Sequence, residues 1–149
     1  MIKRSKANQK QGRTAAQISF NMSQVKSSGS KIERELEKAL RRVRLRPGKH
    51  AVTFGRPDFV FVRAKIAVFC DSHFWHGHNW KVKKYEIKRN RSFWLAKISA
   101  NMDRDRLVTR RLRRDGWIVF RFWEHQILRN SSRCAERVRV AFEARRTGT

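Results

Sequence analysis

Cysteine is scarce in this chain, which has only Cys70 and Cys134 among its 149 residues. Two cysteines cannot build a disulfide framework, so we expect both to be reduced thiols of a cytoplasmic protein. Apolar runs are also short, since the longest, residues 66–70, is far below the roughly 20 residues of a membrane-spanning helix. The N-terminus never reaches the apolar stretch of a secretory signal. The sequence therefore predicts neither a membrane protein nor a secreted disulfide scaffold.

Acidic residues are few as well, with 12 Asp and Glu against 37 Lys and Arg, and the formal net charge is +25. So much positive charge repels itself unless a polyanion neutralises it, which makes nucleic acid the expected partner. A basic protein of the membrane surface would fit the charge alone, but the short apolar runs argue against it. The apolar share of 40% is enough for a core, and the length fits one compact domain.

Residues 1–29 differ in composition from the rest of the chain. They carry Lys and Arg but no acid, and Gly, Ser, Gln and Asn are abundant, so the segment has little apolar surface to bury. We expect a basic arm that becomes ordered on DNA, followed by one folded domain over residues 30–149. The alternative is a merely floppy terminus, although Ile18, Phe20 and Met22 could dock part of the arm.

Hydrophobic spacing predicts an alternation of helices and strands in the folded domain. The expected elements are a helix over residues 31–44, strands over 51–54, 59–62 and 66–70, an irregular segment over 71–91, a helix over 92–114, a strand over 117–123 and a helix over 131–142. Ser30 and Glu33 have the spacing of a capping box at the start of the first helix. A long irregular segment in a small domain is usually functional.

Asp105 falls in the middle of the apolar stripe of the second predicted helix. At about 100° per residue, it lies within about 20° of Trp94 and Leu112. Burying an unpaired carboxylate costs several kcal/mol, so Asp105 should have a specific partner such as a histidine, an arginine or a metal ion. The alternative is a structural ion pair with one of the many arginines.

Asp58 begins one predicted apolar strand, and a second strand ends nearby. Restriction-type nucleases hold Mg²⁺ against a phosphate with this layout, although a Pro-Asp pair is usually only a turn. Histidine is dense in the following irregular segment, at positions 73, 76 and 78, and short histidine tracts often bind metal. Phe74 and Trp75 in the same segment either pack beneath the loop or contact bases.

Five blocks of the sequence together resemble the very short patch repair (Vsr) endonucleases in order, spacing and composition. The blocks are residues 55–60 (GRPDFV), 74–78 (FWHGH), 93–94 with 101–106 (FW and NMDRDR), 116–117 (GW) and 123–124 (WE). The resemblance runs from about residue 20 to residue 128. It implies a PD-(D/E)xK-like, or restriction-endonuclease-like, α/β fold, a single domain whose central mixed sheet is flanked by helices.

The resemblance also implies an activity and its partners. Members of the family nick double-stranded DNA in a Mg²⁺-dependent reaction, and the patch repair members do so beside a T:G mismatch. For this chain it implies a monomeric, nucleoid-associated enzyme of the cytoplasm with no membrane contact. Two other interpretations stay open: a Vsr-like nuclease of a mobile or defence system without mismatch preference, and a DNA-binding module that does not cleave.

Carried over residue by residue, the family's E-D-x-H-D active-site set falls on Glu33, Asp58, Cys70, His76 and Asp105. Asp58 would be the central Mg²⁺ ligand, and the backbone carbonyl of Cys70 would complete the protein's share. His76 would exchange the proton, Asp105 would fix its tautomer, and Glu33 would position a water molecule. The family's DNA wedges, apolar side chains that enter the base stack, fall on Met22, Phe74 and Trp75.

Two departures from the family pattern concern metal sites. The chain has Cys70 and Asp71 where patch repair enzymes have Thr and His, so one usual side chain is missing and an acid is added. At the family's zinc site, His78 is kept, and the cysteine positions are occupied by His73, Trp80 and His125. Three imidazoles could still hold Zn²⁺, although a closed structural zinc site has four ligands. The alternative is that these histidines bind phosphate or line the fold.

Overall fold

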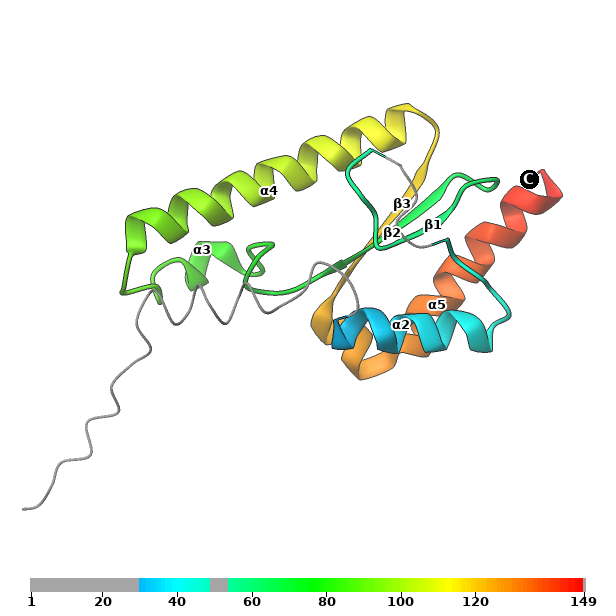
Figure 1. The fold of residues 1–149 in the computed structure, drawn as a ribbon, viewed down its shortest axis with the longest axis horizontal. Coiled ribbons are helices and arrows are strands. Elements are labelled where there is room, and N and C mark those ends of the chain that lie inside the picture. The colour runs from blue at the N-terminus through cyan, green and yellow to red at the C-terminus, as the bar shows by residue number, and fades with distance from the viewer. Residues whose placement is uncertain (1–29, 49–53, 149) are drawn as a thin grey trace, which may run out of the picture.

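The computed structural model describes residues 30–48 and 54–148 of the chain (Figure 1). The predicted arm over residues 1–29, which includes Met22, and most of the predicted strand over residues 51–54 lie outside this part. The described elements are α2 (Lys31–Arg42), β1 (Phe59–Phe61), β2 (Ile66–Asp71), α3 (Trp80–Lys83), α4 (Arg91–Arg114), β3 (Ile118–Trp123) and α5 (Glu124–Thr147).

A three-stranded sheet in the order β1-β2-β3 forms the centre of the described domain. β1 and β2 are antiparallel neighbours in sequence, whereas β2 and β3 are parallel and are connected through α4. Helices α2 and α5 pack against one face of the sheet, and α4 covers the other (Figure 1). This mixed sheet flanked by helices is the α/β architecture expected from the sequence.

The side chains of β2 alternate between two hydrophobic cores. Ile66 and Val68 join the core beneath α2 and α5, whereas Ala67 joins the core that contains Val108 of α4. A strand covered on both faces is apolar at successive positions, which is why residues 66–70 form the longest apolar run of the sequence. Functional polar groups on this strand are therefore confined to its C-terminal end, where Asp71 lies.

Helix α2 begins where its capping signal predicts. The Ser30 hydroxyl accepts a hydrogen bond from the backbone N–H of Glu33 at 3.3 Å, which satisfies one of the free donors of the first turn. The helix ends at Arg42, two residues before the predicted end, because Arg44 has a left-handed backbone with φ of 63°. This geometry places Glu33 on the first turn, beside the C-terminal end of the sheet.

Helix α5 is longer than the predicted segment over residues 131–142, and the predicted start is wrong. The helix begins at Glu124, where the Gln126 side chain accepts from the backbone N–H of Trp123 at 2.8 Å. It is kinked at Asn130, whose side chain accepts from the N–H of Arg133 at 3.0 Å. The polar residues after position 129 thus cap the second half of a kinked helix and do not begin a separate one.

Helices α4 and α5 each contain 24 residues. Their exposed faces are rich in charged side chains, and no helix in the described part of the chain is long and apolar enough to cross a membrane.

Candidate active site

A cleft of about 690 Å³ opens at the C-terminal ends of β2 and β3, between the first turn of α2 and the middle of α4. All four residues expected to be catalytic line it, namely Glu33, Asp58, His76 and Asp105. They come from separate elements, since Glu33 lies on α2, Asp58 precedes β1, His76 follows β2, and Asp105 lies on α4. The structure therefore brings together groups that are up to 72 positions apart in the chain.

Asp58 is anchored to the neighbouring strand by its own carboxylate. Its Oδ2 atom accepts a hydrogen bond of 2.7 Å from the backbone N–H of Cys70. Burial, and then the charges of Glu33 and Asp71, raise the pKa of Asp58 to about 7, although the hydrogen bond from Cys70 acts in the opposite direction. Asp58 thus lies in an acidic environment, where its ionised form is disfavoured until a cation neutralises it.

The donor atoms around Asp58 fit a hard divalent cation. Glu33 and Asp58 offer carboxylate oxygens, and Cys70 lies directly against Asp58, so its carbonyl belongs to the same end of β2. Mg²⁺ prefers oxygen ligands and retains several water molecules, so a small set of protein ligands suffices. The Cys70 thiol is not a suitable ligand, because burial raises its pKa far above the ordinary value of a cysteine.

His76 and Asp105 form a hydrogen-bonded pair across the cleft. Nδ1 of His76 lies 2.7 Å from Oδ2 of Asp105. Burial by itself lowers the pKa of His76, but the hydrogen bond to Asp105 and the charge of Asp71 outweigh burial and raise the pKa. The carboxylate on the apolar stripe of α4 thus has a histidine as its partner, one of the three kinds of partner expected from the sequence.

Two further residues line the cleft, Asp71 and Arg121, and neither belongs to the catalytic set expected from the sequence. Asp71 is the last residue of β2, is only 4% exposed and forms an ion pair with Arg121 of β3 at 3.1 Å. Asp71 appears in the sequence only as a departure from the family pattern. No local sequence pattern indicates that Arg121 belongs to the cleft, because its position beside Asp71 depends on the parallel pairing of β2 with β3.

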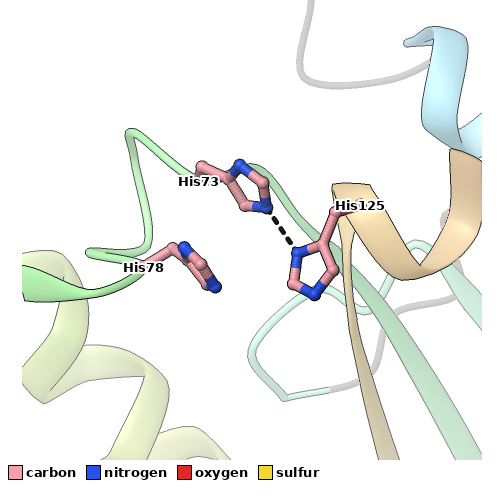
Figure 2. A group of neighbouring side chains, drawn as sticks. All are labelled: His73, His78 and His125. Carbon is pink, nitrogen blue, oxygen red and sulfur yellow. Dashed lines mark hydrogen bonds between the residues drawn. The ribbon is translucent and has the colours of Figure 1, made fainter.

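The three histidines expected at the zinc site lie together (Figure 2). One ring nitrogen from each of His73, His78 and His125 lies within 4.8 Å of the others, and Nε2 of His73 is 2.7 Å from Nδ1 of His125. Burial lowers the pKa of His73, which favours the neutral imidazole that binds metals. Among the described residues, no fourth acidic, cysteine or histidine side chain joins this group.

Phe74 and Trp75 pack on α4. Their rings lie 5.4 Å and 5.9 Å from the ring of Trp94, in edge-to-face arrangements, and Asn101 donates to the backbone carbonyl of Trp75 at 3.2 Å. Each of the two rings remains partly exposed, and Trp75 lines the cleft. The loop is thus held against the helix while part of each ring faces solvent.

Comparison with known proteins shows which sequences this chain is similar to. The family model described as DNA mismatch endonuclease Vsr matches residues 12–82. Type II nicking enzyme V.NmeDIP of Neisseria meningitidis serogroup C is 50% identical over 117 residues, which are 78% of this chain and 79% of the relative. Type II nicking enzyme V.HpaIIP of Haemophilus parainfluenzae is 42% identical over 121 residues, covering 80% and 86%. DNA mismatch endonuclease Vsr of Escherichia coli K12 is 41% identical over 70 residues, covering 47% and 44%.

Proposed function

Because the chain belongs to the Vsr family of DNA endonucleases, we propose that it nicks double-stranded DNA in a Mg²⁺-dependent reaction, at or near a T:G mismatch. The observation that carries the proposal is the meeting of Glu33, Asp58, His76 and Asp105 in one cleft. A DNA-binding module without cleavage would have no use for the His76–Asp105 pair or for buried carboxylates that face a polyanion.

Hydrolysis of a phosphodiester needs an activated water molecule and relief of the negative charge on the phosphoryl oxygens. Mg²⁺, held by Asp58 and the Cys70 carbonyl, would supply charge neutralisation and make the attacking water more acidic. Glu33 orients that water from the first turn of α2. His76 accepts a proton from the water through Nε2 as the new P–O bond forms, and the leaving oxygen departs with the electron pair of the broken P–O bond and takes a proton from solvent. Asp105 holds the opposite nitrogen of the ring.

Binding of the duplex follows from charge and from the aromatic loop. The net charge of +25 attracts the phosphate backbone, and the partly exposed Trp75 lines the cleft, with the ring of Phe74 5.6 Å from its own ring. Apolar side chains inserted at a base step offset the loss of stacking and bend the duplex. We assign Phe74 and Trp75 this wedge role, together with Met22 of the arm, which lies outside the described residues.

We also propose that His73, His78 and His125 bind Zn²⁺. One ring nitrogen from each histidine lies within 4.8 Å of the other two, so small shifts of the side chains would place all three nitrogens at the Zn–N distance of about 2.0–2.1 Å from one ion. The ion would tie the irregular segment after β2 to the start of α5, and so hold the loop that carries His76.

A second candidate function is favoured by the relatives that cover most of this chain. Two of those reported above are named Type II nicking enzymes, and the chain has Cys70 and Asp71 where patch repair enzymes have Thr and His. A nicking enzyme of a mobile or defence system, without preference for a mismatch, fits both facts. Its cleavage chemistry would be the same, and only the selection of the site would differ.

One experiment separates these candidates. The purified protein is incubated with Mg²⁺ and two duplexes of identical sequence, one matched and one with a single T:G mismatch, and any nick is mapped on both strands. Nicking of the mismatched duplex alone supports patch repair, and equal nicking supports the second candidate. Asp58→Ala serves as the control, and it should abolish nicking while DNA binding is retained or becomes tighter. If Asp58→Ala cuts as fast as the parent, the proposed active site is wrong.

A further inference from the structure

All three nitrogens of the Arg121 guanidinium group, on β3, contact residues of neighbouring elements. Its Nη1 lies 3.1 Å and 3.2 Å from the two carboxylate oxygens of Asp71, and 3.5 Å from Oδ1 of Asp105. Its Nη2 donates to the backbone carbonyl of Asp105 at 3.4 Å, and its Nε donates to the hydroxyl of Thr109 at 2.8 Å. The guanidinium stacks 4.0 Å above the ring of Phe69. One side chain thus fixes both carboxylates in a single rigid arrangement.

Both carboxylates lie next to the same ring nitrogen. Nδ1 of His76 is 2.7 Å from Oδ2 of Asp105 and 3.6 Å from Oδ1 of Asp71. His76 itself lies on a loop and lines the cleft, and its Nδ1 is the ring nitrogen that lies next to both carboxylates. Two acceptors placed at Nδ1 make that nitrogen the proton-bearing one, because a donor is needed between them.

We propose that Asp71 and Arg121 are a positioning pair for His76. Arg121 holds Asp71 and Asp105 together, and the two carboxylates fix the orientation and tautomer of the imidazole, so that Nε2 is the nitrogen that accepts the proton. The inference rests on the proposed function, in which His76 is the base. It assigns a role to Asp71, which follows Cys70 at the position where patch repair enzymes have a histidine.

A purely structural ion pair is the competing explanation, and energetics argue against it. A buried pair loses hydration on both charges, and its replacement by well-packed apolar side chains is often neutral or stabilising. Asp71 is 4% exposed, and the Arg121 side chain is 20% exposed. The fold therefore gains little from this pair that two apolar residues would not supply.

The test replaces both charges at once, with the variant Asp71→Leu plus Arg121→Met in the full-length protein. This change leaves the net charge unaltered, so nonspecific attraction to DNA is preserved. We expect a melting temperature equal to or above that of the parent, unchanged duplex affinity and a single-turnover nicking rate about 10- to 100-fold lower at saturating DNA and Mg²⁺. The control is Glu136→Gln plus Arg139→Gln, a charge-neutral change of an exposed pair on α5, and it should nick at the parent rate.

A second readout does not depend on activity. Long-range ¹H–¹⁵N NMR of the metal-free parent, at a pH above the pKa of His76, should show His76 as a single tautomer with its proton on Nδ1, and the double variant should show a mixture. A parent nicking rate, or an unchanged tautomer, in the folded double variant would overturn the proposal. If the parent nicks no duplex, the proposed function fails, but the NMR measurement still decides the role of the pair.

Arg121→Lys covers the case in which the double variant does not fold. Lysine keeps the positive charge, but a single ammonium cannot contact Asp71, Asp105 and Thr109 in the geometry of a planar guanidinium. We expect nicking to slow about tenfold with duplex affinity retained. Nicking by Arg121→Lys at the parent rate would overturn the proposal.

Discussion

Nδ1 of His76 lies 2.7 Å from Oδ2 of Asp105, a residue that the spacing of α4 places among buried apolar side chains. The two residues are 29 positions apart, and nothing local in the sequence joins them. Their contact explains why a carboxylate occupies that position, and it makes Asp105 the best point at which to test whether the cleft performs acid–base chemistry.

Asp105→Asn should reduce the single-turnover nicking rate about 10- to 100-fold, with duplex affinity unchanged. An amide in place of the carboxylate can present N–H to Nδ1 of His76, and so weakens the preference for the tautomer that leaves Nε2 as the acceptor. Asp103→Asn is the matched control, because Asp103 lies on the same helix but is exposed, and it forms an ion pair with Arg106. Equal rates for the two variants would contradict the role of Asp105.

Asp58→Asn should make the metal-free protein more stable at pH 8. The pKa of Asp58 in the folded protein is raised to about 7, so between about pH 4 and pH 7 the folded state holds a proton that the unfolded state has lost. Stability contributed by this group therefore falls as pH rises through that window, and the loss is complete above it. Asparagine does not titrate, so Asp58→Asn removes this pH-dependent loss of stability.

The measurement is thermal unfolding in EDTA at pH 5 and pH 8. The variant should exceed the parent by about 4 °C or more at pH 8, and the two should differ less at pH 5. Mg²⁺ should raise the melting temperature of the parent more at pH 8 than at pH 5, and that of Asp58→Asn at neither. A variant less stable than the parent at pH 8 would show that Asp58 is not held in an acidic environment.

The protein should contain about one equivalent of Zn²⁺ after purification without chelator, measured by elemental analysis. His125→Ala should lose the ion and lower the melting temperature, because the link between the loop and α5 is then broken. Trp80→Phe is the control, since Trp80 occupies a ligand position of the family without offering a ligand atom, and it should retain zinc. Less than about a tenth of an equivalent, with no change in stability on chelation, would contradict the zinc proposal.

Trp75→Ala should weaken binding to the preferred duplex at least about tenfold, or 1.4 kcal/mol, while the salt dependence of binding stays the same. The reason is that an apolar wedge releases no counterions. Phe93→Ala is the control, because Phe93 is 57% exposed beside Trp94 on α4 and has no proposed contact with DNA. If Trp75→Ala binds DNA normally but unfolds at a lower temperature, the ring serves only to pack on Trp94.

Local patterns account for much of the fold and for part of the site. The capping pair of Ser30 and Glu33, the apolar run at residues 66–70 and the helical stripe around Asp105 all predict elements that the structure contains. Each of these signals depends on neighbours within about one or two helical turns, or on alternation along one strand. Helical periodicity and strand alternation can be recognised in a sequence because they determine which side chains face a core.

Contacts made by pairing of distant strands could not be predicted in the same way. Arg121 meets Asp71 because β2 and β3 are parallel in a register that places Phe69 beside Arg121. A shift by one position would turn Arg121 to the other face of the sheet. The start of α5 at Glu124 could not be predicted for a different reason, since the polar residues around Asn130 form the same sequence pattern at a kink as at a helix start.

The parallel pairing of β2 with β3 also determines when the cleft is complete during folding. Asp71 and Arg121 are 50 positions apart, and α4, which carries Asp105, lies between the two strands in sequence. Contacts between residues so far apart in sequence form slowly, because the chain loses conformational entropy when it closes the loop, before packing stabilises the contact. A growing or partly folded chain therefore carries the charge that attracts DNA before it has the cleft, which is complete only when β3 has joined the sheet.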